Sequence, residues 1–312
     1  MNTDEKVKLA IMMCEDKHHN FNDYYHIYPF STENIKGYIN TFDFKNKSFF
    51  TVGSSGDHEL NAINAGCKDI TVLDICPFSR EYLYLKAAAV YFMNPKKFFE
   101  FFSYRNYRLD MFKNNHAFMD TVFPKLLSNL KDMDWDVYFF WNQLFKRYRG
   151  MRIRTRLFMR NEYNYKAISK INNYLDSSDN FAKLRKRLDI IDDIKFINGD
   201  IFDVSIDGTF DNINLSNVVT CYEIEKFMNL FWKMEALLNT DGKMLVGYLY
   251  DTEDGIYDDE KSIYNIKESL KRFPEGINIE EINGVNGYVV GSNKDRDSII
   301  TYKKVKKISK FC

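Results

Sequence analysis

Two short apolar runs, separated by a glycine-containing turn and a helical pattern, open the regular part of the chain. Residues 48–52 read S-F-F-T-V and stop at a glycine, and residues 70–75 read I-T-V-L-D-I, rich in β-branched side chains. Continuous runs of this kind are typical of strands buried on both faces of a parallel sheet. Residues 58–66 between them favour a helix that stops at Gly66. The segment 48–75 therefore predicts one strand–helix–strand unit.

The alternation breaks off after the second strand and resumes near residue 193. Residues 80–93 predict a helix, and the chain from 95 to 190 is helical, aromatic and charged, without a convincing series of strands. Alternating strands and helices predict an α/β fold with a mostly parallel sheet, helices on both faces and a helical insertion. The later strands are expected at 194–197, 210–215, 243–249, 278–285 and 298–305, and the later helices at 223–238 and 261–273.

The first 47 residues precede this alternation. A helical pattern over residues 1–20 gives way to an aromatic stretch over 20–30, and residues 31–34 open a short helix, since Ser or Thr caps a first turn. We therefore expect three parts: an N-terminal segment, a domain in two pieces built on the sheet, and the insertion. Their boundaries are 1–47, 48–94 together with 191–312, and 95–190.

Charge and cysteine content narrow the class of protein. The 312 residues carry 44 basic and 44 acidic side chains, so the formal net charge is zero, whereas a general nucleic-acid-binding domain is basic overall. A local basic patch stays compatible with this balance. The five cysteines form no C-x-x-C pair and no zinc spacing, so we expect no metal site. The odd cysteine count, the charged N-terminus and the lack of a long apolar run indicate a cytoplasmic protein without a transmembrane segment.

The turn after the first strand, residues 53–57 (G-S-S-G-D), is the strongest candidate for chemistry. Glycines let backbone N–H groups approach a ligand closely. Asp74 ends the next strand, where an acid accepts both ribose hydroxyls. The turn lacks the third glycine of a pyrophosphate-binding loop, which disfavours a nucleotide-dependent dehydrogenase. A cofactor with an amino-acid end fits better, because Asp57 can pair with an ammonium group while Ser54 and Ser55 donate to a carboxylate.

Four stretches of the chain resemble the class I S-adenosylmethionine-dependent methyltransferases, which have a Rossmann-like fold. They read F-F-T-V-G-S-S-G-D, T-V-L-D-I, F-I-N-G-D-I-F and F-D-N-I-N-L-S-N-V. More narrowly, V-G-S-S-G-D-H-E-L-N-A-I-N-A-G followed by L-D-I-C-P is similar to a subgroup near the betaine-lipid synthases, which transfer the 3-amino-3-carboxypropyl group of the same cofactor. The resemblance covers residues 27–93 and 193–305, not the insertion, and implies a seven-stranded sheet.

The resemblance implies S-adenosylmethionine as the cofactor and supplies its binding residues. Residues 53–57 would surround the methionine part, Asp74 would hold the ribose, and residues 200–201 would lie at the adenine. The reacting end would face residues 216–217, since ligands of such sheets bind at the carboxyl ends of the strands. Tyr28, in the N-terminal segment that would cover the cofactor, would stack on the sulfonium. The implied set is Tyr28, Gly53, Ser54, Ser55, Gly56, Asp57, Asp74, Ile75, Asp200, Ile201, Ser216 and Asn217.

These positions also have purely structural interpretations. Gly53 and Gly56 alone make a tight turn, Asp57 is suited to cap the following helix, and Asp200 is suited to the turn 198–200. Residues 216–217 can simply end a strand. The conjunction of the glycine turn with acids at the ends of the next two strands favours the cofactor site.

Three further side chains near this site are more simply structural. His26 and His58 are the nearest histidines, and a lone histidine more often has a structural role. Cys221 is most simply a small buried residue rather than a nucleophile. The Asn- or Asp-Pro-Pro-aromatic pattern of amino-group DNA methylation is absent at 214–217.

Two surface features carry alternative interpretations. A basic stretch could bind the phosphates of a nucleic acid, a lipid headgroup or a small anion, but we favour a solvated helix face paired with acids. Residues 98–102 hold four phenylalanines, for which core packing is favoured over a lipid-facing patch. The members of the basic stretch are Lys146, Arg147, Arg149, Arg152, Arg154, Arg156 and Arg160.

The sequence thus predicts an S-adenosylmethionine-dependent transferase, foremost a methyltransferase. Its acceptor is not identified and includes small molecules and lipid headgroups, with nucleic acid not favoured. A sulfonium makes each attached carbon electrophilic, so the main requirement is alignment of a nucleophile for in-line attack. Transfer of the 3-amino-3-carboxypropyl group and a non-catalytic cofactor-binding module are the alternatives. No residue is assigned as the general base.

Overall fold

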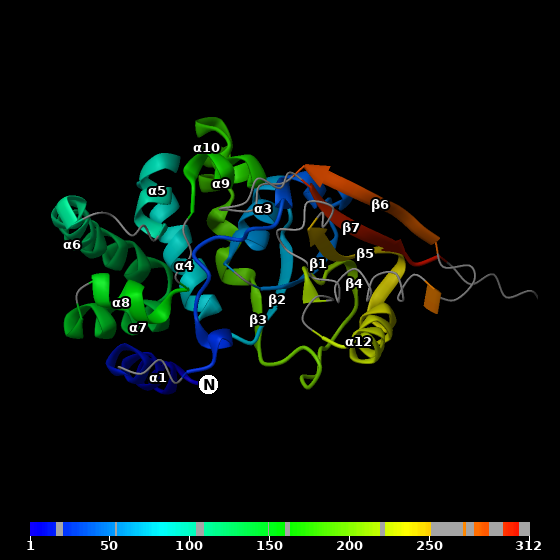
Figure 1. The fold of residues 1–312 in the computed structure, drawn as a ribbon, viewed down its shortest axis with the longest axis horizontal. Coiled ribbons are helices and arrows are strands. Elements are labelled where there is room, and N and C mark those ends of the chain that lie inside the picture. The colour runs from blue at the N-terminus through cyan, green and yellow to red at the C-terminus, as the bar shows by residue number, and fades with distance from the viewer. Residues whose placement is uncertain are drawn as a thin grey trace, which may run out of the picture.

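The computed structural model confirms the α/β class. It describes residues 1–16, 21–53, 55–103, 109–148, 150–159, 163–218, 222–250, 271–272, 278–286 and 296–305. Figure 1 shows a twisted sheet on one side of the molecule and a group of helices, α5 to α8, at the end away from β6 and β7. No helix of the described residues is both long and apolar enough to cross a membrane.

The sheet is mixed, with the strand order β3-β2-β1-β4-β5-β7-β6. The first five strands of this order pair in parallel, whereas β7 pairs antiparallel with both β5 and β6. The chain runs outward from β1 in both directions, to β2 on one side and β4 on the other. The bounds are β1 (Ser48–Val52), β2 (Asp69–Asp74), β3 (Lys195–Asn198), β4 (Phe210–Asn214), β5 (Leu238–Tyr250), β6 (Asn278–Asn286) and β7 (Arg296–Lys303).

Strand β5 begins five residues earlier than the expected 243. Its first residue, Leu238, pairs with Phe210 of β4, and the register then shifts before Lys243. The Asp241 N–H, at a positive φ of 65°, donates to Lys304 O at 2.8 Å. Residues 239–242, which lie between the expected helix and the expected strand, are therefore part of β5, across a register shift of the kind that a β-bulge produces.

The helices agree with the predicted pattern where both are described. The two crossover helices are α3, which follows β1, and α4, which follows β2; the expected helix at 261–273 lies outside the described residues except for residues 271–272. The bounds are α1 (Thr3–Glu15), α2 (Ile35–Tyr38), α3 (Asp57–Ala65), α4 (Ser79–Val90), α5 (Pro95–Phe102), α6 (Leu109–Met133), α7 (Trp135–Arg147), α8 (Gly150–Leu157), α9 (Tyr165–Ile171), α10 (Ser178–Arg185) and α12 (Ile224–Ala236), with 3₁₀ turns η1 (Asp23–Tyr25), η2 (Ile39–Thr41), η3 (Asn173–Leu175) and η4 (Leu188–Asp193).

Successive residues of the central strands enter two separate hydrophobic cores. Phe49 packs into the core that α3 and α4 share, and Phe50 into the core beneath α12. In β2, Val72 and Leu73 divide in the same way. This follows from the alternation of side chains along a strand, and it shows that helices cover both faces of the sheet.

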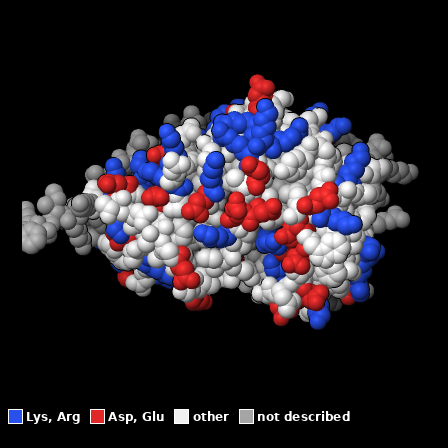
Figure 2. Space-filling view, turned by 180° about the vertical axis from the view of Figure 1, so that it is seen from behind, with Lys and Arg blue, Asp and Glu red and all other residues white. Residues whose placement is uncertain are grey.

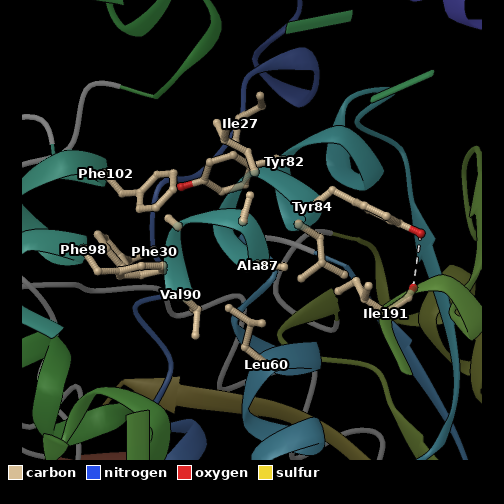
Figure 3. Close-up of a cluster of buried hydrophobic side chains, with 14 of the residues drawn as sticks. Ile27, Phe30, Leu60, Tyr82, Tyr84, Ala87, Val90, Phe98, Phe102 and Ile191 are labelled. Atoms are coloured by element: carbon tan, nitrogen blue, oxygen red, sulfur yellow. Dashed lines mark hydrogen bonds between the residues drawn. The ribbon is translucent and has the colours of Figure 1, made fainter. Parts of the chain in front are cut away.

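The insertion shares the first of these cores. Figure 3 shows Phe98 and Phe102 of α5 against Phe30 and the α4 residues Tyr82 and Val90. Core packing is thus confirmed for the four phenylalanines of residues 98–102, each at most 5% exposed. The hydrophobic core is continuous across residue 94, from the sheet-bearing part of the chain into the helices that follow.

The Asp57 carboxylate joins these parts by hydrogen bonds. It is fully buried at the start of α3. Lys86 Nζ of α4 lies 2.6 Å from Oδ1, and the Tyr174 hydroxyl of η3 donates to the same oxygen at 2.5 Å. The Ser31 N–H and the Ser55 hydroxyl donate to Oδ2 at 2.7 and 2.8 Å. One side chain therefore ties the turn after β1 to α4, to the insertion and to the N-terminal segment.

A charge in such a place is tolerated only when it is fully compensated. Lys86 is also fully buried, and its ammonium lies 4.6 Å from the Phe30 ring centroid and 5.1 Å from that of Tyr82. Burial lowers the pKa of Lys86, and the negative charge of Asp57 opposes that effect. The pair is therefore a structural element whose two charges depend on each other.

Replacing Lys86 with Met should destabilise the protein by about 3–5 kcal/mol, because Asp57 would remain buried without its counter-charge. The free energy of unfolding in urea measures this loss. Lys96→Met is the matched control: Lys96 is exposed, 4.0 Å from Glu100, and its replacement should change the free energy by less than about 0.5 kcal/mol. A Lys86→Met protein as stable as the control would contradict the structural role of the pair.

Candidate functional site

A cavity of about 370 Å³ opens at the carboxyl ends of the parallel strands. Its size lies within the range usual for small-ligand sites. The strand order reverses between β1 and β4, which makes this place the topological switch point of the sheet. Open α/β sheets bind ligands in the crevice at such a point. The strand ends contribute Val52 and Gly53 after β1, Leu73, Asp74, Ile75 and Cys76 after β2, Gly199, Asp200 and Ile201 after β3, and Ser216, Asn217, Val218 and Tyr222 after β4.

The remaining wall comes from the cover segment, which we define as residues 21–34. Its inward positions are Tyr24, His26, Tyr28, Phe30, Ser31, Thr32 and Glu33. Contacts along its whole length attach the segment to the rest of the protein. Ile27 exchanges backbone hydrogen bonds with the end of α8, the Tyr82 hydroxyl donates to Pro29 O at 2.8 Å, and the Ser31 N–H donates to Asp57. These contacts hold residues 27–31 at this edge of the sheet.

Asp74, at the end of β2, presents an unpartnered oxygen to this cavity. Its Oδ1 accepts the Cys76 N–H at 2.9 Å, whereas its Oδ2 is buried and has no hydrogen-bond partner among the described residues. Burial raises the pKa of Asp74 to about 7. A buried acceptor without a donor is costly, so Oδ2 is suited to a ligand that brings hydroxyl groups.

Gly53 allows this carboxylate to lie where it does. A Cβ on Gly53 would come within 2.7 Å of Asp74 Oδ2, closer than such contacts allow. The Gly53 N–H donates to Leu73 O at 2.7 Å, which fixes the end of β1 against the end of β2. Glycine is therefore required at this position for close approach rather than for an unusual φ.

A second acid, Glu33, lies in the cavity wall on the cover segment. Its Oε2 accepts the Tyr38 hydroxyl at 3.0 Å and lies 3.2 Å from His58 Nε2. The Ser216 hydroxyl donates to its Oε1. His58 Nδ1 lies 3.1 Å from Val52 O, so a protonated imidazole donates from both nitrogens.

Glu33 and His58 form a buried ion pair beside the cavity. Burial opposes the ionisation of Glu33, but the charge of His58 and three hydrogen bonds outweigh it and lower the pKa of Glu33. Burial also disfavours the charged form of His58, but the charge of Glu33 outweighs that effect and raises the pKa of His58 to about 9. His58 therefore has the structural role that the sequence favoured, as the counter-ion of an acid that no sequence motif indicated.

Eight of the twelve predicted cofactor residues line the cavity together. They are Tyr28, Gly53, Asp74, Ile75, Asp200, Ile201, Ser216 and Asn217. They come from four strand ends and the cover segment, which only the fold brings to one place.

Three of the other predicted positions, Ser55, Gly56 and Asp57, do not line the cavity. Ser54 lies outside the described residues, and Ser55 and Gly56 stand behind the wall with Asp57. The prediction that Asp57 pairs with a ligand ammonium needs correction, because the ammonium of Lys86 already occupies that carboxylate. It does not cap α3 either: the N-cap is Gly56, at φ 78°, and the Asp57 carboxylate accepts from other segments.

Two other predicted positions combine a structural contact with a place in the wall. Asp200 Oδ1 accepts the Phe202 N–H at 3.0 Å, as expected of a turn residue, and Asp200 also lines the cavity. Ser216 has a positive φ of 51°, an unusual conformation for a residue with a side chain. Its N–H donates to Asn214 Oδ1 at 3.0 Å, which holds the chain in this turn as it leaves β4.

The described part of the basic stretch bonds to the protein itself. Arg147 pairs with Glu15 at 2.7 Å, Arg152 donates to Cys14 O at 3.1 Å, and Arg154 donates to a backbone carbonyl of Ser103. Arg147 thus pairs with an acid, as the favoured interpretation expected, whereas Arg152 and Arg154 bond to backbone carbonyls instead. Arg149 and Arg160, like Cys221, lie outside the described residues.

Charge on the surface is mixed. On the face in Figure 2, acidic and basic side chains are interspersed, with one gathering of basic side chains along the upper edge. The cavity differs from this surface: Glu33, Asp74 and Asp200 line it, whereas no lysine or arginine is among the described residues of its wall. The cavity is therefore suited to a ligand with positive charge and hydroxyl groups rather than to a phosphate.

Comparisons with known proteins give only distant likenesses. No protein-family model and no curated protein sequence matches the chain. Among solved structures, the N-methyltransferase NodS from Bradyrhizobium japonicum WM9 is 11% identical, with 88% of this chain and 93% of that chain covered and a TM-score of 0.40. The glycopeptide N-methyltransferase MtfA is 10% identical, with coverages of 87% and 88% and a TM-score of 0.40. Because these likenesses are slight, the function proposed below rests on the residues of this chain.

The Glu33–His58 pair should make stability fall at alkaline pH. The ordinary pKa of His58 is 6.5 and its folded value is about 9, so its contribution is complete below pH 6.5 and is lost as the pH rises through 9. The loss should be on the order of 3 kcal/mol. Urea unfolding from pH 6 to pH 10 measures it, and His58→Gln should remove this part of the pH dependence. Titration of the His58 ring near pH 6.5 in NMR spectra would show that the pair does not exist.

Proposed function

We propose that the chain is an S-adenosylmethionine-dependent transferase whose cofactor occupies the cavity at the carboxyl ends of β1, β2, β3 and β4. The observation that carries this proposal is the unpartnered Asp74 Oδ2 at the end of β2. A ribose diol supplies two hydroxyl donors to one carboxylate, which would satisfy this oxygen. Gly53 keeps the space beside it open.

The charge of the cavity wall supports a cofactor of this kind over a dinucleotide. Three carboxylates and no described lysine or arginine line the cavity. A pyrophosphate would place two negative charges among these acids, at a cost of desolvation and repulsion. A sulfonium and an ammonium group would instead be attracted. The wall carboxylates and the missing third glycine of the turn both disfavour a nucleotide-dependent dehydrogenase.

The other wall residues suit the rest of the cofactor. Ile75 and Ile201 offer apolar surface to a base, and Asp200 lies beside Ile201 to accept from an exocyclic amino group. Ser216 and Asn217, at the end of β4, would face the reacting end. Tyr28 of the cover segment lines the cavity, where its ring would stack on a sulfonium.

When bound, the cofactor would supply an electrophilic carbon on its sulfonium. The part of this chain would be to bind it, hold it at the strand ends and admit an acceptor for in-line attack. Methyl transfer is our first proposal, and 3-amino-3-carboxypropyl transfer is its alternative. The helices of residues 95–190 contact the cover segment through the backbone hydrogen bonds of Ile27 at the end of α8. We propose that they shape the acceptor site, because fold alone does not determine the substrate.

Binding and product analysis test the proposal together. The protein should bind S-adenosylmethionine and S-adenosylhomocysteine in calorimetry, and should not bind NAD⁺ under the same conditions. With an acceptor, S-adenosylhomocysteine as product indicates methyl transfer and methylthioadenosine indicates 3-amino-3-carboxypropyl transfer; cofactor binding without turnover indicates a binding module. Failure to bind either S-adenosyl compound at millimolar concentration would refute the proposal.

The pH dependence of binding should reveal the role of Asp74. Two hydroxyls donate best to an ionised carboxylate, and the pKa of Asp74 is raised to about 7. Adenosine affinity should therefore be greatest above pH 7 and fall as the pH decreases below it, by about tenfold per unit for one proton. Asp74→Asn should bind adenosine more weakly at pH 8 and lose this dependence. Equal calorimetric affinities at pH 5.5 and 8 in the unsubstituted protein would contradict this role.

A further inference from the structure

Glu33 is a cavity acid that no sequence motif indicated. It lies on the cover segment, is 4% exposed, and reaches the cavity beside the strand ends. Its contact with Ser216 places it at the end of β4, and its contact with His58, whose other nitrogen meets Val52 O, places it near the end of β1. Glu33 thus lies at the crevice between β1 and β4, where the strand order reverses.

The Glu33 carboxylate retains room for one more donor, on Oε1. An ionised carboxylate has about four acceptor sites. Two are taken on Oε2, by Tyr38 and His58, and one on Oε1, by Ser216. The same contacts hold the carboxylate in one orientation. A donor that approached through the cavity would therefore meet a fixed, charged acceptor.

Asp57, the acid to which the sequence assigned the ammonium group of the ligand, is not available to bind it. Asp57 is completely buried, does not line the cavity, and is bonded to the ammonium of Lys86. Lys86 is in turn enclosed by the rings of Phe30 and Tyr82. Of the two acids, only Glu33 can meet a cationic group of a ligand.

We propose that Glu33 binds the ammonium group at the amino-acid end of the nucleoside ligand. This rests on the function proposed above and replaces the role that the sequence suggested for Asp57. Glu33 is then a specificity-determining residue, which distinguishes a nucleoside that carries an amino-acid end from one that lacks it. Its ionised state, maintained by His58, suits this role.

The location of Glu33 adds a consequence for the cover segment. Ser31, two residues before Glu33, is held by Asp57, whereas Glu33 itself would be held from the other side by the ligand. A ligand with an amino-acid end would thus connect the strand ends to the cover segment. A ligand without that end would contact the strand ends but lack this connection.

Two ligands that differ at the amino-acid end test the proposal. S-adenosylhomocysteine carries the ammonium group, and methylthioadenosine has the same nucleoside without it. Glu33→Gln should weaken S-adenosylhomocysteine binding by about tenfold or more, because a hydrogen bond to a charged group is lost, and change methylthioadenosine binding by less than about twofold. Calorimetry measures both affinities.

Glu59→Gln is the matched control. Glu59 is a buried glutamate on α3, next to His58, and does not line the cavity. Both ligands should bind this variant with unchanged relative affinity. If Glu33→Gln weakens both ligands equally, or neither, the assignment of Glu33 is wrong while the proposed function stands. If the unsubstituted protein binds neither ligand, both proposals fail.

Hydrogen exchange on the unsubstituted protein provides a test that needs no variant. S-adenosylhomocysteine should slow the exchange of amides in residues 30–34 several-fold more than saturating methylthioadenosine does, because only the first ligand reaches Glu33. Equal protection of these amides by the two ligands would overturn the proposal even if Glu33→Gln does not fold.

Discussion

The compensation of one buried carboxylate, that of Asp57, determines how the parts of this protein fit together. Lys86 supplies its counter-charge, and donors from the cover segment, the turn after β1 and the insertion complete its hydrogen bonds. A buried charge is unstable without such partners. The positions of α4, η3 and residue 31 are therefore linked through a single side chain, although they are far apart in sequence.

The acids at this edge of the sheet therefore have two different roles. Asp57 is neutralised within the protein and fixes the cover segment in place. Asp74 and Glu33 face the cavity, one with an unpartnered oxygen and the other with an acceptor site to spare. Asp57 does not line the cavity, whereas Asp74 and Glu33 do, although Glu33 also has His58 as a counter-ion within the protein. The cavity is consequently negative in character, which suits a cationic nucleoside and opposes a pyrophosphate.

Local hydrophobic pattern and spacing predicted the strand–helix–strand unit with its glycine turn and Asp74. Together with the family resemblance they predicted eight of the twenty residues that line the cavity. The same patterns could not predict the partners of the acids. Lys86 and Tyr174 lie 29 and 117 positions from Asp57, and Ser216 lies 183 positions from Glu33. Only tertiary packing brings them together. The sequence therefore assigned the ligand ammonium to Asp57, the acid of the glycine turn. Glu33 belongs to no motif, so no local pattern indicated it.

A crystal structure of the protein grown with S-adenosylhomocysteine tests the central claim most directly. We predict ribose hydroxyls within hydrogen-bond distance of Asp74 Oδ2, the ammonium group on Glu33 Oε1, and an undisturbed Asp57–Lys86 pair. Density for the amino-acid end at Asp57, with Lys86 displaced, or for the nucleoside away from Asp74, would contradict the account.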